Sequence, residues 1–190
     1  MKTKYTSEIF EVLRKGKFIC SNSPDEDIQT LYRVLEDENV FEDLYEYFSQ
    51  IKYILKQGDE FFYFSKKEKS IDLDRKIEKA FGWIDIVDFL KTFDSSFDIG
   101  TRFTASEIHN QLKNNADLKM KLDNLKKIGT NKKNYLDRIK KIIEKLEKDN
   151  YVTLENEISE TYKVLNSFNY LKDLINTINI SEEIANEIPE

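Results

Sequence analysis

The sequence predicts a mainly α-helical (α+β) protein made of two tandem winged-helix domains, each with three helices followed by a β-hairpin wing. Residues 7–67 have the order helix, short extended segment, helix, helix and two apolar strands joined at a Gly-Asp turn, and residues 84–180 repeat that order in outline. The 190 residues include only 5 Gly and 2 Pro, which favours long helices over turn-rich sheet. A chain of this length has room for two small domains.

The first domain is expected to occupy residues 1–66. A helix over residues 8–15 ends at Gly16, and Lys17–Cys20 is predicted to be a short strand. Ser23 is the expected N-cap of the second helix, with Pro24 at its first helical position. The second and third helices carry apolar residues at the spacings typical of core-facing helices, namely Ile28, Leu31, Tyr32 and Leu35, then Phe41, Leu44, Tyr45, Phe48 and Ile51.

The hairpin that closes this domain is apolar on both faces. A wing with one face in water should instead alternate apolar and polar residues. Its outer face must therefore be covered by the chain's own second half, by a second copy of the chain, or by a different protein. The candidate residues of a partner or dimer interface are Tyr53, Leu55, Phe61, Phe62, Tyr63 and Phe64.

Residues 67–83 are highly charged, but Leu73, Ile77 and Phe81 recur at four-residue spacing and predict a connecting helix. Gly82 is expected to break or bend this helix. The boundary between the two domains is therefore placed between residues 66 and 84.

The second domain is expected over residues 84–180, followed by a frayed acidic tail over residues 181–190. Its predicted helices cover residues 86–93, 105–128 with a break near Asn114-Asn115, 131–148 and 167–180. Thr104 and Glu107 have the spacing of a capping box. Two strands surround a turn at residues 155–157, and the second should place Ile158, Tyr162 and Val164 on one face.

The sequence offers little for catalysis. It contains no GxxxxGK[ST], GxGxxG, GxSxG or HExxH motif. Its one Cys, Cys20, is expected to be a buried and inert thiol, and with one His the chain cannot assemble a His/Cys zinc site. We therefore expect no enzyme activity and no cofactor, with a carboxylate-only metal site left open. No stretch approaches the length of a membrane span, so a cytoplasmic location is expected.

Charge is distributed unevenly along the chain. Residues 1–65 contain 8 Lys and Arg against 13 Asp and Glu, whereas residues 111–148 contain 12 against 5. The basic helix expected over residues 131–148 would be the third helix of the second winged-helix domain. In winged-helix proteins the third helix often docks on DNA. Because lysine suits phosphates better than base edges, we expect non-specific contact with double-stranded DNA. The candidate DNA-binding residues are Lys132, Lys133, Arg138, Lys140, Lys141 and Lys145.

Three strings in the first domain, FEVLRKGKFIC, LYRVLED and YEYFSQIKYILKQGDEFFYFS, resemble the MukE/MksE family. These proteins are the kleisin-interacting, tandem winged-helix accessory subunits of bacterial condensin-like SMC complexes, including Wadjet-type relatives. The resemblance rests on motifs over residues 8–66 and on architecture over residues 84–180. The residues that carry it are Phe10, Leu13, Gly16, Lys17, Phe18, Ile19, Leu31, Tyr32, Tyr47, Phe48, Leu55, Phe62 and Tyr63.

This resemblance implies a non-catalytic homodimer that binds a kleisin subunit and, through it, an SMC-like coiled-coil ATPase. It also implies nucleoid association, and it leaves chromosome organisation and plasmid defence as alternative settings. The residues alone also allow two other classes of protein. One is a winged-helix transcription regulator, and the other is an adaptor that binds only proteins.

Overall fold

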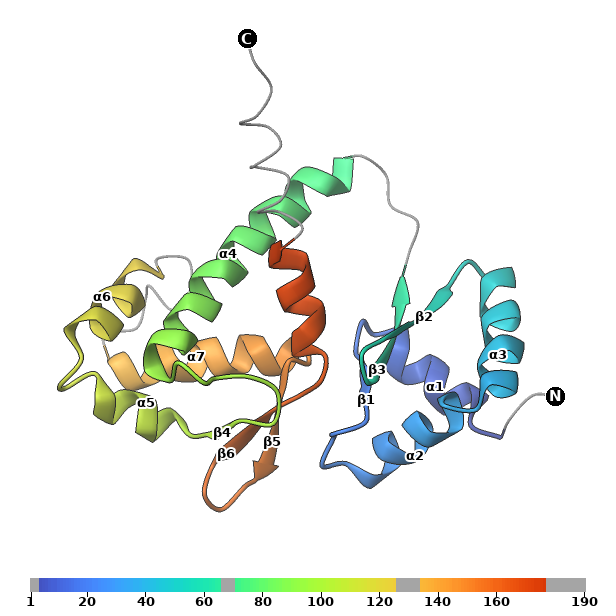
Figure 1. The fold of residues 1–190 in the computed structure, drawn as a ribbon, viewed down its shortest axis with the longest axis horizontal. Coiled ribbons are helices and arrows are strands. Elements are labelled where there is room, and N and C mark those ends of the chain that lie inside the picture. The colour runs from blue at the N-terminus through green and yellow to red at the C-terminus, as the bar shows by residue number, and fades with distance from the viewer. Residues whose placement is uncertain (1–3, 66–70, 126–133, 177–190) are drawn as a thin grey trace, which may run out of the picture.

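The computed structural model describes residues 4–65, 71–125 and 134–176, with backbone alone for residues 71–80. The first half, coloured blue to teal in Figure 1, contains three helices and three strands. In chain order these are α1 (Thr6–Leu13), β1 (Ile19–Cys20), α2 (Glu26–Leu35), α3 (Glu38–Gln50), β2 (Ile54–Gly58) and β3 (Phe61–Ser65). The strands form an antiparallel sheet in the order β1-β3-β2.

The second half begins with a long helix and ends with a second hairpin. Its elements are α4 (Ile71–Phe93), β4 (Arg102–Phe103), α5 (Ala105–Gln111), α6 (Ala116–Asn124), α7 (Tyr135–Lys148), β5 (Val152–Asn156) and β6 (Thr161–Val164). The strands pair antiparallel in the order β4-β6-β5. A last helix covers residues 168–176. The predicted mixed α+β class is confirmed, and each half contains one three-stranded sheet with the same strand order.

Local capping chemistry sets several helix boundaries. The Thr104 hydroxyl accepts a hydrogen bond from the Glu107 N–H and the Glu107 carboxylate accepts one from the Thr104 N–H, so the predicted capping box is confirmed. Asn115 caps α6, which confirms the break in this region. The cap of α2 is Asp25 rather than Ser23. The Asp25 carboxylate accepts the N–H groups of two first-turn residues, whereas Ser23 accepts the Asp25 N–H before the helix begins.

Gly82 is expected from the sequence to break or bend helix α4, but α4 runs through it without a break, so the predicted break is wrong. A Cβ at Gly82 would meet no atom within 4 Å. No close contact there forces the backbone away from helical geometry.

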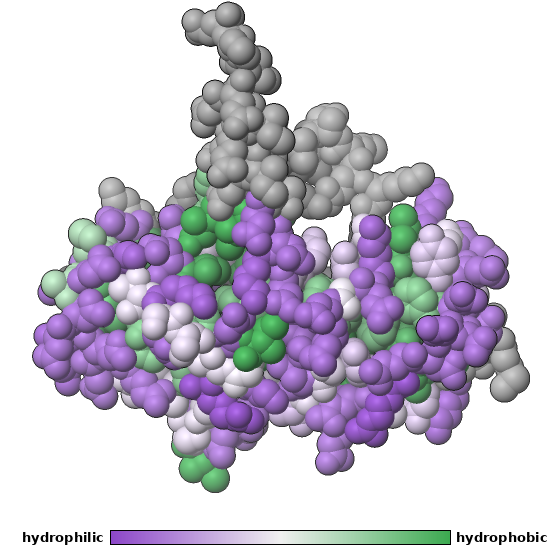
Figure 2. All heavy atoms as spheres, in the orientation of Figure 1, coloured by the Kyte–Doolittle hydropathy of each residue, from purple (hydrophilic) through white to green (hydrophobic). Residues whose placement is uncertain are grey.

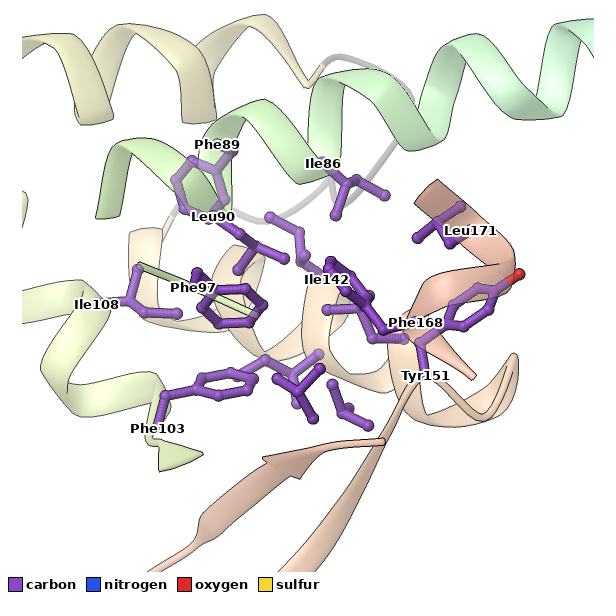
Figure 3. Packing of buried hydrophobic residues seen from close by; sticks show 14 of the residues in the cluster. Ile86, Phe89, Leu90, Phe97, Phe103, Ile108, Ile142, Tyr151, Phe168 and Leu171 are labelled. Atoms are coloured by element: carbon purple, nitrogen blue, oxygen red, sulfur yellow. The ribbon is translucent and has the colours of Figure 1, made fainter. Parts of the chain in front are cut away.

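The second half has a core of aromatic and branched side chains. Figure 3 shows Phe97 and Phe103 below Leu90 of α4, with Ile142 of α7 and Phe168 of the last helix beside them. Phe97, Phe103 and Phe168 are all under 2% exposed. The first half has its own core, built on residues of all three of its helices and its sheet, including Ile9, Leu35, Leu44 and Phe48.

The β2–β3 hairpin separates these two cores. In the observed register Leu55 lies opposite Phe64 and Gln57 lies opposite Phe62, so these residues share one face of the sheet. Leu55, Phe62 and Phe64 pack in the core of the first half, whereas Phe61 and Tyr63 on the other face pack with the second half. The chain therefore covers the outer face of its own hairpin.

Polar contacts reinforce this junction. The Phe18 N–H donates to Asn150 Oδ1 at 2.7 Å, and the Asn166 Nδ2 donates to Glu60 Oε2 at 2.6 Å. Asn166 is only 3% exposed, so its amide is bonded rather than solvated. Two surfaces more than 100 residues apart in sequence are thereby held in one arrangement.

The β5–β6 hairpin differs from the prediction at its tip. Ile158 belongs to the turn rather than to a strand, because the Asn156 side chain accepts the N–H groups of Ile158 and Ser159 and β6 starts only at Thr161. Its side chain is 98% exposed. Figure 2 shows hydrophobic atoms protruding at the bottom of the molecule, where Figure 1 shows the tip of the β5–β6 hairpin.

Candidate functional site: a groove between the halves and a basic helix

A groove of about 760 Å³ lies where the two halves meet. Its aromatic side chains come from five segments of the chain. They are Phe18 beside β1, Tyr63 and Phe64 of β3, Trp83 of α4, Tyr151 after α7, and Tyr170 of the last helix. Phe18 packs against Tyr63, Tyr151 and Tyr170 with ring centroids 5.4–6.0 Å apart. The result is a continuous aromatic surface.

Two tyrosines of this surface, Tyr63 and Tyr151, are in their neutral form at physiological pH. Burial raises the pKa of both phenols. A neutral phenol can donate a hydrogen bond as well as accept one. The groove therefore combines ring faces with hydroxyl groups that can bond to carbonyl or carboxylate oxygens.

Four lysines line the groove, and they are not equivalent. Lys141 pairs with Glu144, and Lys145 lies 3.4 Å from Asp149. Lys145 Nζ also lies 4.1 Å from the centroid of the Trp83 ring, in the geometry of a cation–π contact. Lys17 and Lys148 form no ion pair with any acidic residue that the structure describes. They supply the uncompensated positive charge of this site.

The predicted DNA-binding residues that the structure describes have different surroundings. Arg138 lies at the start of α7 against α6, where its guanidinium donates to Asp123 Oδ1 at 2.7 Å and to the Leu122 carbonyl at 2.5 Å. Its side chain is 14% exposed, which fits a packing role. Lys140 pairs with Glu160 of the β5–β6 turn at 3.2 Å, whereas Lys141 and Lys145 line the groove. Lys132 and Lys133 lie outside the described residues.

The predicted interface residues of the hairpin are largely used within the chain. Leu55, Phe61 and Phe62 are at most 2% exposed, so they present no free surface to a partner. The other three, Tyr53, Tyr63 and Phe64, are half-buried. Of these, Tyr63 and Phe64 line the groove.

Sequence reasoning missed five residues of the groove: Lys17 as a charged group, Trp83, Lys148, Tyr151 and Tyr170. Each sits in a segment whose local pattern is ordinary, and tertiary folding brings them together. The two-faced apolar hairpin was the one signal that pointed to this place.

The part of the chain that the structure describes contains no cluster of three or more His, Cys, Asp or Glu side chains arranged to hold a metal ion. None of its helices has the length and apolar character needed to cross a bilayer. Cys20 is buried, and burial raises the pKa of its thiol to about 11, so it stays protonated at neutral pH.

Comparison with protein families gives a match to the model described as condensin complex protein MksE, over residues 4–175. The chain belongs to the MksE family. The match covers both halves and therefore extends beyond the N-terminal strings that carried the resemblance. No match to an individual curated protein was found. Membership of the MksE family implies membership of a condensin complex, which makes the groove and α7 the surfaces to consider for partners.

Proposed function

We propose that this chain is a non-catalytic subunit of a bacterial condensin-like SMC complex, acting at the nucleoid. In this role it binds a kleisin subunit and, through it, a coiled-coil ATPase. The observation that carries the proposal is the family match over residues 4–175. Chromosome organisation and plasmid defence are both compatible with such a subunit.

The two halves act in this proposal as tandem winged-helix units, over residues 1–66 and 84–180. The support is their common topology, since a helix, a short strand and further helices precede a hairpin in each, and the strand orders β1-β3-β2 and β4-β6-β5 correspond. Residues 71–83 belong to α4 and so continue into the second unit.

A homodimer is also part of the proposal, on the ground of the family. The doubly apolar hairpin no longer argues for it, because the chain's own second half covers the outer face. Tyr53, Tyr63 and Phe64 keep part of their surface accessible and remain candidate contact residues. Light scattering on the purified chain measures this directly.

Non-specific contact with double-stranded DNA is a further part of the proposal. The ion pairs of Lys140 and Lys141 are exposed, and exposed pairs are worth about 1 kcal/mol or less, so phosphates can replace their carboxylates. Arg138 is held against α6 and is assigned to packing instead. Contact would rest on Lys140, Lys141 and Lys145, with Lys132 and Lys133 from outside the described residues.

The same ion pairs favour a second candidate, an adaptor that binds only proteins. Every described member of the predicted DNA-binding set has an acidic partner, which reduces the positive potential that a phosphate backbone would meet. By contrast, a sequence-reading transcription regulator needs arginine or amide side chains free for base edges, and α7 offers mainly lysine.

Affinity capture of the tagged chain from its own cells tests the proposal. The expected co-purifying proteins are a kleisin-like subunit and a large coiled-coil ATPase, retained after nuclease treatment. Capture of DNA fragments enriched at promoters, without these proteins, would instead support the regulator and overturn the proposal.

A further inference from the structure

The groove is built to hold a ligand rather than to pack two halves closely. Its aromatic side chains are contributed by five separate segments, and its volume of about 760 Å³ is in the range of sites that hold small ligands or short chain segments. Tyr63, Phe64, Tyr170 and Leu174 are only half-buried there, so apolar surface faces solvent. An exposed apolar concavity at a domain junction favours an occupant with apolar groups.

The charged residues that line the groove favour an occupant that carries negative charge. Lys17 comes from the first half and Lys148 from the end of α7, and neither has an acidic partner among the described residues. Glu144 and Asp149 are already engaged by Lys141 and Lys145. An occupant with a few carboxylates would therefore gain two uncompensated lysines without displacing an existing pair.

The small number of lysines without a described acidic partner argues against a nucleic acid as the occupant of the groove. A single strand also stacks on aromatic side chains, but its backbone brings one negative charge per nucleotide and binds through grooves lined by many cations. Here Lys17 and Lys148, which have no acidic partner among the described residues, share the rim with the carboxylates of Glu144 and Asp149. A peptide can space its charges and apolar side chains to match this pattern.

We infer that the groove binds an extended acidic segment of a partner protein, with aromatic or branched apolar side chains on the ring surface and carboxylates on Lys17 and Lys148. The inference deepens the proposed function and rests on it, because it names the surface and the chemistry by which the subunit would hold its partner. Neutral Tyr63 and Tyr151 hydroxyls would bond to the backbone carbonyls of the segment.

The chain's single tryptophan makes the test direct. Trp83 lines the groove, with Lys145 over its ring. The full-length chain is titrated with a short synthetic peptide in which Asp and Glu alternate with Phe and Leu, while Trp83 emission is recorded. We expect a saturable change in emission, and no change with the same peptide carrying Lys in place of its acidic residues.

Charge reversal locates the binding. The double variant Lys17→Glu/Lys148→Glu should bind the acidic peptide about tenfold more weakly or worse, since two attractive contacts become repulsive. Lys113→Glu carries a charge reversal at the end of α5, where Lys113 bonds only to Asn110 in the described structure, and should bind within about twofold of the parent. Circular dichroism checks that the variants are folded.

Three outcomes would overturn the inference. One is equal peptide affinity for the Lys17→Glu/Lys148→Glu variant and the parent. Another is saturable binding of oligothymidylate with no binding of the acidic peptide. The third is peptide binding that appears only after Glu182, Glu183 and Glu187 are changed to Gln, which would assign the groove to the acidic tail of the chain itself.

Failure of this inference can be separated from failure of the proposed function. If the parent and the Lys17→Glu/Lys148→Glu variant capture kleisin-like and ATPase partners equally from cells, the subunit role stands and the groove is not the binding surface. If neither captures any such partner, the proposed function fails, whatever the peptide titration gives.

Discussion

Asn22 and Asn166 form a reciprocal pair of hydrogen bonds across the junction of the two halves, and we call this pair the bracket. The backbone N–H of Asn22 donates to Asn166 Oδ1 at 3.2 Å, and the backbone N–H of Asn166 donates to Asn22 Oδ1 at 3.0 Å. Each side chain thus satisfies a main-chain group in the other half. The Asn22 Nδ2 also donates to the Val164 carbonyl, so the bracket fixes the turn after β1 to the end of β6.

Loss of this bracket should destabilise the whole chain. Asn166→Ala leaves the half-buried Asn22 N–H without its partner and takes one of its donors from the exposed Glu60 carboxylate, and we expect a loss of about 1–2 kcal/mol in the free energy of unfolding. Urea denaturation measures it. Asn110→Ala, which removes an exposed asparagine, serves as the control and should change stability by less than about 0.5 kcal/mol. Equal stability of the two variants would show that the bracket contributes nothing.

Gly58 and Gly82 should respond in opposite ways to alanine. A Cβ at Gly58 would lie 2.2 Å from Phe61 Cζ, and the Phe61 ring cannot move away because it packs with the second half. We expect Gly58→Ala to cost about 1–3 kcal/mol. Gly82→Ala adds a methyl group in open space inside α4 and should stabilise by about 0.5–1 kcal/mol. Thermal unfolding of both variants decides the matter, and destabilisation by Gly82→Ala would mean that α4 is bent there after all.

Acid should weaken the second sheet through Glu155. The carboxylate of Glu155 accepts two hydrogen bonds from Arg102, at 2.5 and 2.9 Å, and lies near Lys163, and these contacts hold the pKa of Glu155 below its usual value. A lowered pKa in the folded state stabilises above the unfolded-state pKa, and this stabilisation is lost as pH falls through the folded-state pKa. The loss therefore begins near pH 4.5 and continues downward.

Glu155→Gln should remove that part of the pH dependence. Because Arg102 is more than half exposed, the effect is expected to be small, below about 1 kcal/mol. The measurement is the difference in unfolding free energy between parent and variant at pH 7 and pH 3.5. A difference that stays constant between the two pH values would contradict the assignment.

Binding to DNA should depend on α7 and on salt. If about three lysines reach phosphates, the logarithm of affinity should fall with the logarithm of salt concentration at a slope of roughly −3. Lys140→Glu/Lys141→Glu should abolish most of the binding and reduce that slope, whereas Lys113→Glu should leave both nearly unchanged. Fluorescence anisotropy with a labelled duplex gives both quantities. Undiminished binding by the double variant at low salt would leave the protein-only adaptor as the better account.

The order of helices and strands was predictable because it depends on local signals. Thr104 and Glu107 form a capping box from their spacing, and Asn115 ends one helix and begins another. Competing local signals produced the errors. Ser23 and Asp25 are both good N-caps, and the carboxylate that accepts two N–H groups prevails. Ile158 has the right parity for its strand, but the Asn156 side chain extends the turn to include it.

The groove could not be predicted in the same way. Trp83, Tyr151 and Tyr170 belong to an interhelical face, a strand entry and a terminal helix, and no spacing rule connects them. The sequence did indicate that the hairpin needed a cover. The composition allowed three covers: the chain's own second half, a second copy of the chain, or a different protein. Which one covers the hairpin depends on the Asn22–Asn166 and Phe18–Asn150 contacts, which form between residues more than 100 positions apart. Charge patterning likewise identified basic residues without revealing which were already paired.

The mass of the assembly purified through the tagged chain shows whether the chain is a subunit of a condensin-like complex. Native mass spectrometry after nuclease treatment should find two copies of the 22.6 kDa chain bound to a kleisin-like subunit and a coiled-coil ATPase. A chain that is recovered from its own cells as a free 22.6 kDa monomer, with no kleisin-like or ATPase partner, would contradict the account.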